Sequence, residues 1–323
     1  MKKLYIIGNG FDLHHKLKTE YKEFARFLSR KNRETYDALL MYYGLPDIDW
    51  SMGHTNRLNE WSQFESALSQ LAFEEVLEHN SDLIARPGSP DFKDGDWHTF
   101  QIEMQMLIEK LTIGLIKEFQ IFILNVDFPP LNKDLIINLD RDSIFLNFNY
   151  TETLELYYAV PKNNICYIHN KANQLDKSII LGHGVDPNKF IPQDPKAPEN
   201  LTEEELEYWN QELTDSYDYS YSSAKSELLT YFTKSFKNTA QIIEENKAFF
   251  NSINDVDSTL VLGHSLSDVD EAYFKEIIKR VKATNKWTVS YYGDSEKLAH
   301  MERMKLLGVN TSNLNLVRLE ELK

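Results

Sequence analysis

Short apolar runs that end in glycine or polar residues recur along the chain, and they predict the strands of a buried sheet. They cover residues 4–7, 144–149, 165–168, 178–181, 258–262, 287–292 and 314–319. Apolar runs of strand length are typical of parallel strands that are covered on both faces. The pattern therefore predicts an α/β fold with a mainly parallel, Rossmann-like sheet flanked by helices.

Between these runs, apolar residues recur three or four positions apart, which predicts helices. Leu17, Tyr21 and Phe24 follow this spacing after the first strand. The main part of that helix is expected to start at Thr19 or Glu20, and residues 13–18 are expected to form an exposed connection. The first strand therefore leads into a helix, as in a βα unit.

A long helical segment interrupts the alternation of strands and helices. Within it, Trp61, Phe64 and Leu68 lie on one helical face. Glu65 beside them is interpreted as part of a solvated helix edge, although a buried carboxylate that serves a site is the alternative. We interpret the segment as a large helical insertion.

The same pattern predicts how the chain is divided. Residues 1–30, 134–185 and 224–323 are expected to form a Rossmann-like nucleotide-binding core, with residues 31–133 as the helical insertion. Residues 186–223 contain four prolines and an acidic run, and they are interpreted as a surface excursion or a lid.

Composition and charge narrow the class of protein. The 323 residues are 42% hydrophobic, which suits two domains or one α/β domain with a large insertion. The formal net charge of −15 opposes binding to nucleic acid or to anionic membranes. A single cysteine, Cys166, excludes an intramolecular disulfide and a thiolate metal cluster. The first apolar run is too short for a secretion signal, and residues 107–126 carry the charges of an amphipathic helix, so a cytoplasmic protein without membrane contact is expected.

The candidate chemistry lies where the predicted strands end. In parallel sheets, ligands bind outside the carboxyl ends of the strands, because loops and helix N-termini converge there. Each turn taken alone is also compatible with ordinary turn chemistry, but together they favour a nucleotide site. The residues are Gly8, Asn9, Gly10, Phe11, Asp12, Asn147, Asn149, His169, Gly182, His183, Gly184, Gly263, His264, Ser265, Asp268 and Asp270.

The types of residue at these strand ends limit the reaction. The sequence has no Gly-Lys-Ser/Thr phosphate loop, no Gly-x-Ser-x-Gly elbow and no His-Glu-x-x-His helix, so those hydrolase classes lack support. Amides, imidazoles and carboxylates remain. They suit cleavage of the bond between ribose and nicotinamide, which needs a positioned ribose, a held water and a base but no strong acid, because the leaving group is already cationic.

Several segments together resemble the bacteriophage abortive infection AbiH family. They are residues 4–12, 19–21, Trp61 with Phe64 and Glu65, 148–151, 167–169, 182–184 and 263–274. The resemblance covers almost the full chain, and its motifs at residues 7–13 and 263–274 are the more specific ones. It implies an anti-phage abortive-infection protein.

The same order is remotely similar to the sirtuin-like fold of bacterial NAD-hydrolysing defence proteins. The matching residues are Gly8 and Gly10 for the glycine turn, Asn149 with Tyr150 for an Asn-Tyr pair, His169 for the catalytic histidine, and Gly263, Ser265, Leu266 and Asp268 for a late Gly-x-Ser-Leu-x-Asp motif. Asn9, Phe148, Thr151 and Asn170 stand where that fold has alanine, threonine, aspartate and glycine. The zinc-binding cysteines of protein deacylases are absent from the sequence.

This resemblance implies roles for particular residues in a NAD glycohydrolase. Asn149 would hold the ribose or the attacking water, and His169 would act as the base. Backbone N–H groups of residues 8–11 would hold the pyrophosphate, and Asp12 or Asp268 would orient ribose hydroxyls or the glycine turn. The implied nucleotide-binding residues are Gly8, Asn9, Gly10, Phe11, Asp12, Gly263, His264, Ser265 and Asp268. NAD or a related nucleotide is the expected substrate or ligand, and no metal is expected.

Two other functions stay open at this point. The substitutions at Asn9, Thr151 and Asn170 suit a module that senses a nucleotide without turning it over. A metal-dependent nuclease that uses His14, His15, His183 and carboxylates is a further alternative, which the net charge opposes. A phage-derived trigger, a partner protein and a homo-oligomer are compatible with the sequence.

Overall fold

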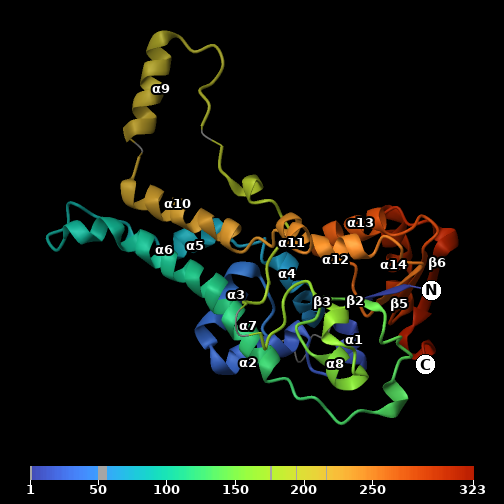
Figure 1. Cartoon of the computed structure of the whole chain (residues 1–323). Helices are drawn as coiled ribbons and strands as arrows, with labels where there is room; N and C mark the ends of the chain where they lie inside the picture. Colours follow the sequence, from blue (N-terminus) through green and yellow to red (C-terminus); the bar gives the residue numbers. More distant parts are fainter. Residues whose placement is uncertain (1, 50–56, 175–176, 194, 216) are drawn as a thin grey trace.

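A six-stranded parallel sheet forms the centre of the computed structural model, which describes residues 2–49, 57–174, 177–193, 195–215 and 217–323 (Figure 1). The strands are β1 (Lys3–Ile7), β2 (Ile144–Asn147), β3 (Ile165–Tyr167), β4 (Ser258–Leu262), β5 (Lys286–Tyr291) and β6 (Leu314–Arg318). Their order is β3-β2-β1-β4-β5-β6, and every neighbouring pair is parallel. This is the strand order of a Rossmann fold, in which the ligand crevice lies where the order reverses, here between β1 and β4. The predicted fold class is confirmed.

Helices cover both faces of this sheet, which explains why its strands are apolar on both sides. Leu4 and Ile6 of β1 belong to one hydrophobic cluster with the helices that follow residue 238. Tyr5 and Ile7 point into the opposite cluster, which Phe11 and Leu154 complete. The covering helices are α1 (Asn9–His14), α8 (Thr153–Tyr158), α11 (Thr239–Glu245), α12 (Lys247–Ser252), α13 (Glu271–Arg280) and α14 (Asp294–Leu306).

A second hydrophobic core joins the helices that lie beside the sheet (Figure 1). Its centre includes Phe24, Trp61 and Phe64, which are fully buried. The helices are α2 (Tyr21–Lys31), α3 (Arg33–Tyr43), α4 (Phe64–Ala67), α5 (Phe73–His79), α6 (Thr99–Glu109), α7 (Leu115–Leu124) and α10 (Tyr219–Lys234). A π-helical turn, Lys110–Gly114, makes α6 and α7 one continuous rod. The division of the chain into domains remains a prediction.

Two expected segments differ from the structure. Residues 178–181 do not form a strand. They lie outside the sheet, and Ile179 and Leu181 pack into the helical core. Gly182 lies so close to the Ser235 carbonyl that a Cβ atom would approach it to 2.2 Å. Residues 13–18 are not an exposed connection, because α1 extends to His14 and Leu17 is buried.

The acidic helix α9 (Glu203–Asp215) stands away from the rest of the chain in Figure 1. Among the described residues, no helix combines the length and the apolar character needed to cross a membrane.

Candidate functional site

Two glycine turns pack directly against each other at the carboxyl ends of β1 and β4. Gly8 N–H donates to the Leu262 carbonyl at 3.0 Å, and Gly10 N–H donates to the Gly263 carbonyl at 2.7 Å. A Cβ atom on Gly8 would lie 2.5 Å from the Cα of His264. The glycines are therefore needed for contact between the turns.

These contacts correct the expectation that the N–H groups of residues 8–11 hold a pyrophosphate. The N–H groups of Gly8, Gly10 and Phe11 already donate to protein carbonyls. Asn9 is exposed at the start of α1, and its side chain pairs with Thr19 through a 2.6 Å hydrogen bond from the threonine hydroxyl. Phe11 is buried in the hydrophobic cluster below the sheet edge.

A cavity of about 800 Å³ lies at this sheet edge, between the sheet and the helices beside it. Of the residues with an implied catalytic or nucleotide-binding role, all except Phe11 line it, and they are Gly8, Asn9, Gly10, Asp12, Asn149, His169, Gly263, His264, Ser265 and Asp268. The strand-end candidates Asn147, Gly182, His183 and Gly184 are not part of the lining. The structure thus brings together residues from the ends of four strands. The cavity lies where the strand order reverses, which is the usual place of a ligand in this class of fold.

Asn149 lies buried beside the first glycine turn. Its Nδ2 donates to the Gly8 carbonyl at 3.1 Å, and its backbone N–H donates to Oδ1 of Asn147 at 3.0 Å. In the described part of the chain, no hydrogen bond reaches Oδ1 of Asn149. The Asn149 side chain is therefore held in place through Nδ2, and it lines the cavity.

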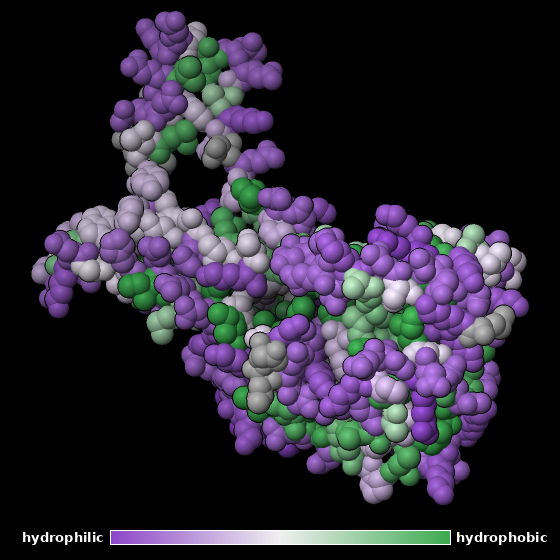
Figure 2. Space-filling model, viewed as in Figure 1, coloured by the Kyte–Doolittle hydropathy of each residue, from purple (hydrophilic) through white to green (hydrophobic). Residues whose placement is uncertain are grey.

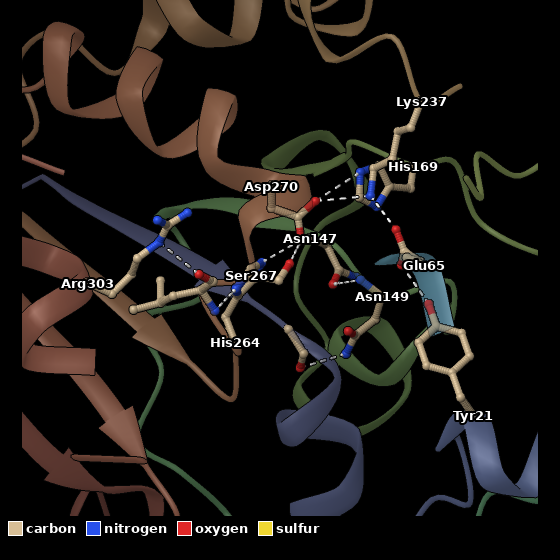
Figure 3. Close-up of polar contacts among 12 residues, drawn as sticks. Tyr21, Glu65, Asn147, Asn149, His169, Lys237, His264, Ser267, Asp270 and Arg303 are labelled. Carbon is tan, nitrogen blue, oxygen red and sulfur yellow. Dashed lines mark hydrogen bonds and ion pairs between the residues drawn. The ribbon is translucent and has the colours of Figure 1, made fainter. Parts of the chain in front are cut away.

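A network of buried charges closes the opposite side of the cavity (Figure 3). The Lys237 ammonium, whose side chain is fully buried, lies 2.7 Å from Oε2 of Glu65 and 3.0 Å from Oδ1 of Asp270. The Tyr21 hydroxyl donates to Oε1 of Glu65 at 2.6 Å. Burial alone would raise the pKa of Asp270, but Lys237 and the nearby histidines hold it below its usual range.

Two histidines face the same carboxylate of Asp270. Nε2 of His169 lies 3.9 Å from Oδ1, and Nε2 of His264 lies 3.5 Å from Oδ2. The Leu266 N–H donates to Nδ1 of His264 at 2.9 Å, so the proton of neutral His264 is on Nε2 and points toward Asp270. Phe148 packs edge-on against both rings.

Both histidines are neutral near pH 7. Burial lowers the pKa of His264 to about 4. Burial and the positive charge of Lys237 hold the pKa of His169 well below its ordinary value. Nε2 of His169 is buried and has no hydrogen-bond partner among the residues described here. A neutral imidazole with a vacant nitrogen can accept a proton from a bound water or hydroxyl.

The backbone after His169 accommodates a change that the sequence comparison marked as a departure. Asn170 has φ +60°, in the left-handed region. Glycine and asparagine are the residues that adopt this conformation at the least cost. Asparagine is therefore well suited to this position of the backbone.

Asp12 is placed differently from the predicted ribose contact. Its carboxylate is buried and accepts hydrogen bonds from the hydroxyls of Thr151 and Thr153, both at 2.6 Å. It therefore ties α1 to the start of α8. Burial raises the pKa of Asp12 to about 6, against the effect of these hydroxyls.

The raised pKa of Asp12 predicts a pH-dependent stability. A carboxyl group whose pKa is higher in the folded than in the unfolded chain stabilises the fold below pH 4, and this contribution is lost as the pH rises through 6. We expect the difference in unfolding free energy between wild type and Asp12→Asn to fall by on the order of 3 kcal/mol from pH 4 to 7. Urea unfolding at several pH values measures it. The exposed Asp91→Asn is the control, and a constant difference for Asp12→Asn would contradict the prediction.

The remaining predicted residues lie at the rim. Oδ1 of Asp268 pairs with the Arg303 guanidinium at 2.8 Å. Nε of Arg303 also donates to the Leu266 carbonyl at 3.1 Å. Ser265 is exposed next to this pair. Arg303, from α14, therefore holds the outer part of the second turn in place.

The three histidines of the nuclease hypothesis lie outside the cavity lining, and only the rings of His14 and His15 contact each other, with 5.0 Å between their centroids, among the contacts described. His14 contacts the Leu135 carbonyl, His15 accepts a hydrogen bond from the Tyr158 hydroxyl, and His183 packs among phenylalanines. Within the described ranges, no group of three histidine, cysteine or acidic side chains is placed to hold a metal ion.

Sequence reasoning missed part of this site. Lys237 lies in a turn after α10, where no pattern marked it, and only its complete burial reveals it. The interpretation of Glu65 as a solvated helix edge was wrong, because its carboxylate pairs with Lys237 and Tyr21. The spacing of Trp61 and Phe64, which are both fully buried, was the available signal that Glu65 lies next to a core.

The fold and the cavity together define a class of protein: a doubly wound, Rossmann-like α/β protein with a polar cavity where the strand order reverses. The family model described as bacteriophage abortive infection AbiH matches residues 4–291. The chain belongs to this AbiH family, which implies a part in abortive infection by bacteriophage. Among curated proteins and among solved structures, nothing matches the chain.

Proposed function

We propose that this protein acts in anti-phage defence by hydrolysing NAD or a related nucleotide in the cavity between β1 and β4. The observation that carries the proposal is that Asn149 and His169 line one cavity at the point where the strand order reverses. The remote similarity to sirtuin-like defence proteins supports the same two residues.

The proposed reaction is attack of water on C1′ of the ribose that carries nicotinamide. The bond from C1′ to the ring nitrogen breaks, and its electron pair neutralises the cationic ring. Nε2 of His169 accepts the proton that the water loses, and ADP-ribose and nicotinamide are the products. Oδ1 of Asn149 holds a ribose hydroxyl or the water in position.

The buried charges support this assignment of roles. His169 is neutral before reaction, because burial and Lys237 lower its pKa. The Asp270 carboxylate, 3.9 Å from Nε2, favours the imidazolium that forms when the proton arrives. Glu65 and Lys237 would act as positioning residues, because they hold Asp270 in place.

Release of nicotinamide from NAD by the purified protein tests the proposal. We expect His169→Ala and Asn149→Ala each to lower the rate by about 100-fold or more, because each removes a group that acts on the reacting atoms. His14→Ala is the matched control, since this histidine lies outside the cavity lining. The unfolding of each variant shows whether its fold is intact. Wild-type protein that neither releases nicotinamide nor binds ADP-ribose would exclude the proposed function.

A nucleotide sensor without chemistry is the second candidate. It is favoured because polar groups of the site already have partners within the protein. The amide of Asn149 donates to the Gly8 carbonyl, and the carboxylates of Glu65 and Asp270 contact Lys237. Calorimetry with ADP-ribose separates the two candidates. Tight binding without nicotinamide release, and unchanged phage defence in an Asn149→Ala, His169→Ala double variant, would favour the sensor.

A further inference from the structure

The rod formed by α6, the π-helical turn and α7 carries an unusual exposed face. Ile102, Met106, Ile113 and Leu124 are each more than half exposed. They follow one another at multiples of three to four residues, so they lie along one side of the rod. We call this set, together with the exposed Glu109 and Lys117 between them, the rod stripe.

The opposite sides of the rod are already covered by the protein. α6 packs along α10, and α7 packs on α2. Figure 1 shows α6 and α10 side by side in a part of the molecule that lies away from the sheet, and Figure 2 shows a few hydrophobic residues on the lower edge of this part. Isolated exposed apolar residues are common, but several of them on one side of a long helical rod are typical of an interface.

Apart from Met106, whose position corresponds to Gln120, the residues of the rod stripe are placed symmetrically about Ile113. Glu109 and Lys117 lie four residues before and after it, and Ile102 and Leu124 lie eleven residues before and after it, roughly 16 Å along the axis. An antiparallel copy of the rod, centred on Ile113, would therefore place Glu109 opposite Lys117 and Ile102 opposite Leu124. Such pairing of one surface with itself is what a twofold interface requires.

The charges of Glu109 and Lys117 favour a second copy of the rod as the partner, and they favour the antiparallel arrangement. In a parallel pair, Glu109 would face Glu109 and Lys117 would face Lys117, which is repulsive. In the antiparallel pair, both contacts join opposite charges. Lys117 forms no hydrogen bond or ion pair within the part of the chain that the structure describes, so it is available to a partner.

From this symmetry we propose that the rod stripe is a homodimer interface, in which two copies of this chain pair their α6–α7 rods antiparallel about a twofold axis at Ile113. The apolar side chains supply the buried area, and the two Glu109–Lys117 pairs fix the register. The proposal does not depend on the chemistry of the cavity.

Sedimentation equilibrium of the full chain over a hundredfold range of concentration tests the proposal. Wild type is expected to form a dimer, and Ile113→Glu is expected to weaken dimerisation by about 100-fold or more, because it places two like charges at the axis. Ile113 is exposed, so the variant should fold, which circular dichroism checks. Leu298→Glu on α14 is the matched control, since Leu298 is an equally exposed apolar helix residue away from the rod.

A charge swap tests the register separately. Glu109→Lys and Lys117→Glu are each expected to weaken the dimer, because each creates like-charged contacts. The double variant restores opposite charges across the axis, and its affinity is expected to return to within about tenfold of wild type. A wild-type protein that stays monomeric, a dimer unaffected by Ile113→Glu, or a double variant weaker than both single variants would overturn the proposal.

Discussion

Replacing Lys237 by methionine is expected to destabilise the fold by about 3–5 kcal/mol. The ammonium of Lys237 is fully buried between Glu65 and Asp270. Burial alone would lower the pKa of Lys237, but these two carboxylates raise it, so the lysine is charged in the folded protein. Methionine has a similar volume but leaves two carboxylates buried without a cation. Urea unfolding measures the loss.

A variant in which all three residues of the cluster are neutral tests whether unpaired charge causes the loss of stability. The triple variant Lys237→Met, Glu65→Gln, Asp270→Asn contains no unpaired charge, so it is expected to regain most of the lost stability. Lys247→Met is the surface control, because its ion pair with Glu244 is exposed to solvent, and it is expected to leave the stability nearly unchanged. Equal losses in the single and triple variants would show that packing, and not charge, explains the effect.

Gly263→Ala is expected to be at least as damaging, with a loss of about 4 kcal/mol or failure to fold. Gly263 has φ +65°, which an alanine adopts only under strain. In addition, its Cβ atom would lie 2.1 Å from the Phe11 nitrogen and 2.4 Å from the Gly10 carbonyl carbon. Both neighbours are backbone atoms of the first glycine turn, so they cannot move away without separating β1 from β4.

Two other glycines separate the strain from the clash. Gly44 has φ +63° but open space around it, so Gly44→Ala is expected to lose only about 1 kcal/mol. Gly95 has neither a positive φ nor a close neighbour, and its alanine variant is expected to be within about 0.5 kcal/mol of wild type. Thermal unfolding of the three alanine variants measures the order of their stabilities. A Gly263→Ala variant as stable as Gly44→Ala would contradict the close packing of the turns.

The sheet could be predicted from sequence because its strands carry their own signal. Residues 4–7 and 258–262 are apolar on both faces, since helices cover both sides of the sheet, and each ends in glycine. The segment at 178–181 carries the same signal but forms no strand, because local composition does not record whether a sheet edge is within reach. Ile179 and Leu181 of this segment are buried all the same.

The site was predictable only on the side formed by strand ends. Asn149 and His169 follow strands directly, so the order of strands brings them together. Lys237 reaches the same place from the connection between α10 and α11, and Glu65 reaches it from α4. Their positions depend on how two cores pack against each other. Asp12 shows a structural use that the sequence did not indicate, because its carboxylate at a strand end joins two elements through Thr151 and Thr153.

The distance in sequence between Glu65 and Lys237 has a consequence for biosynthesis. Their contact spans 172 residues, which a ribosome needs roughly 10–35 s to synthesise. Until then the carboxylate of Glu65 has no cation to pair with and stays in water, and Asp270 emerges later still. A nascent chain therefore cannot assemble the complete network of buried charges until residues 237 and 270 have both been synthesised.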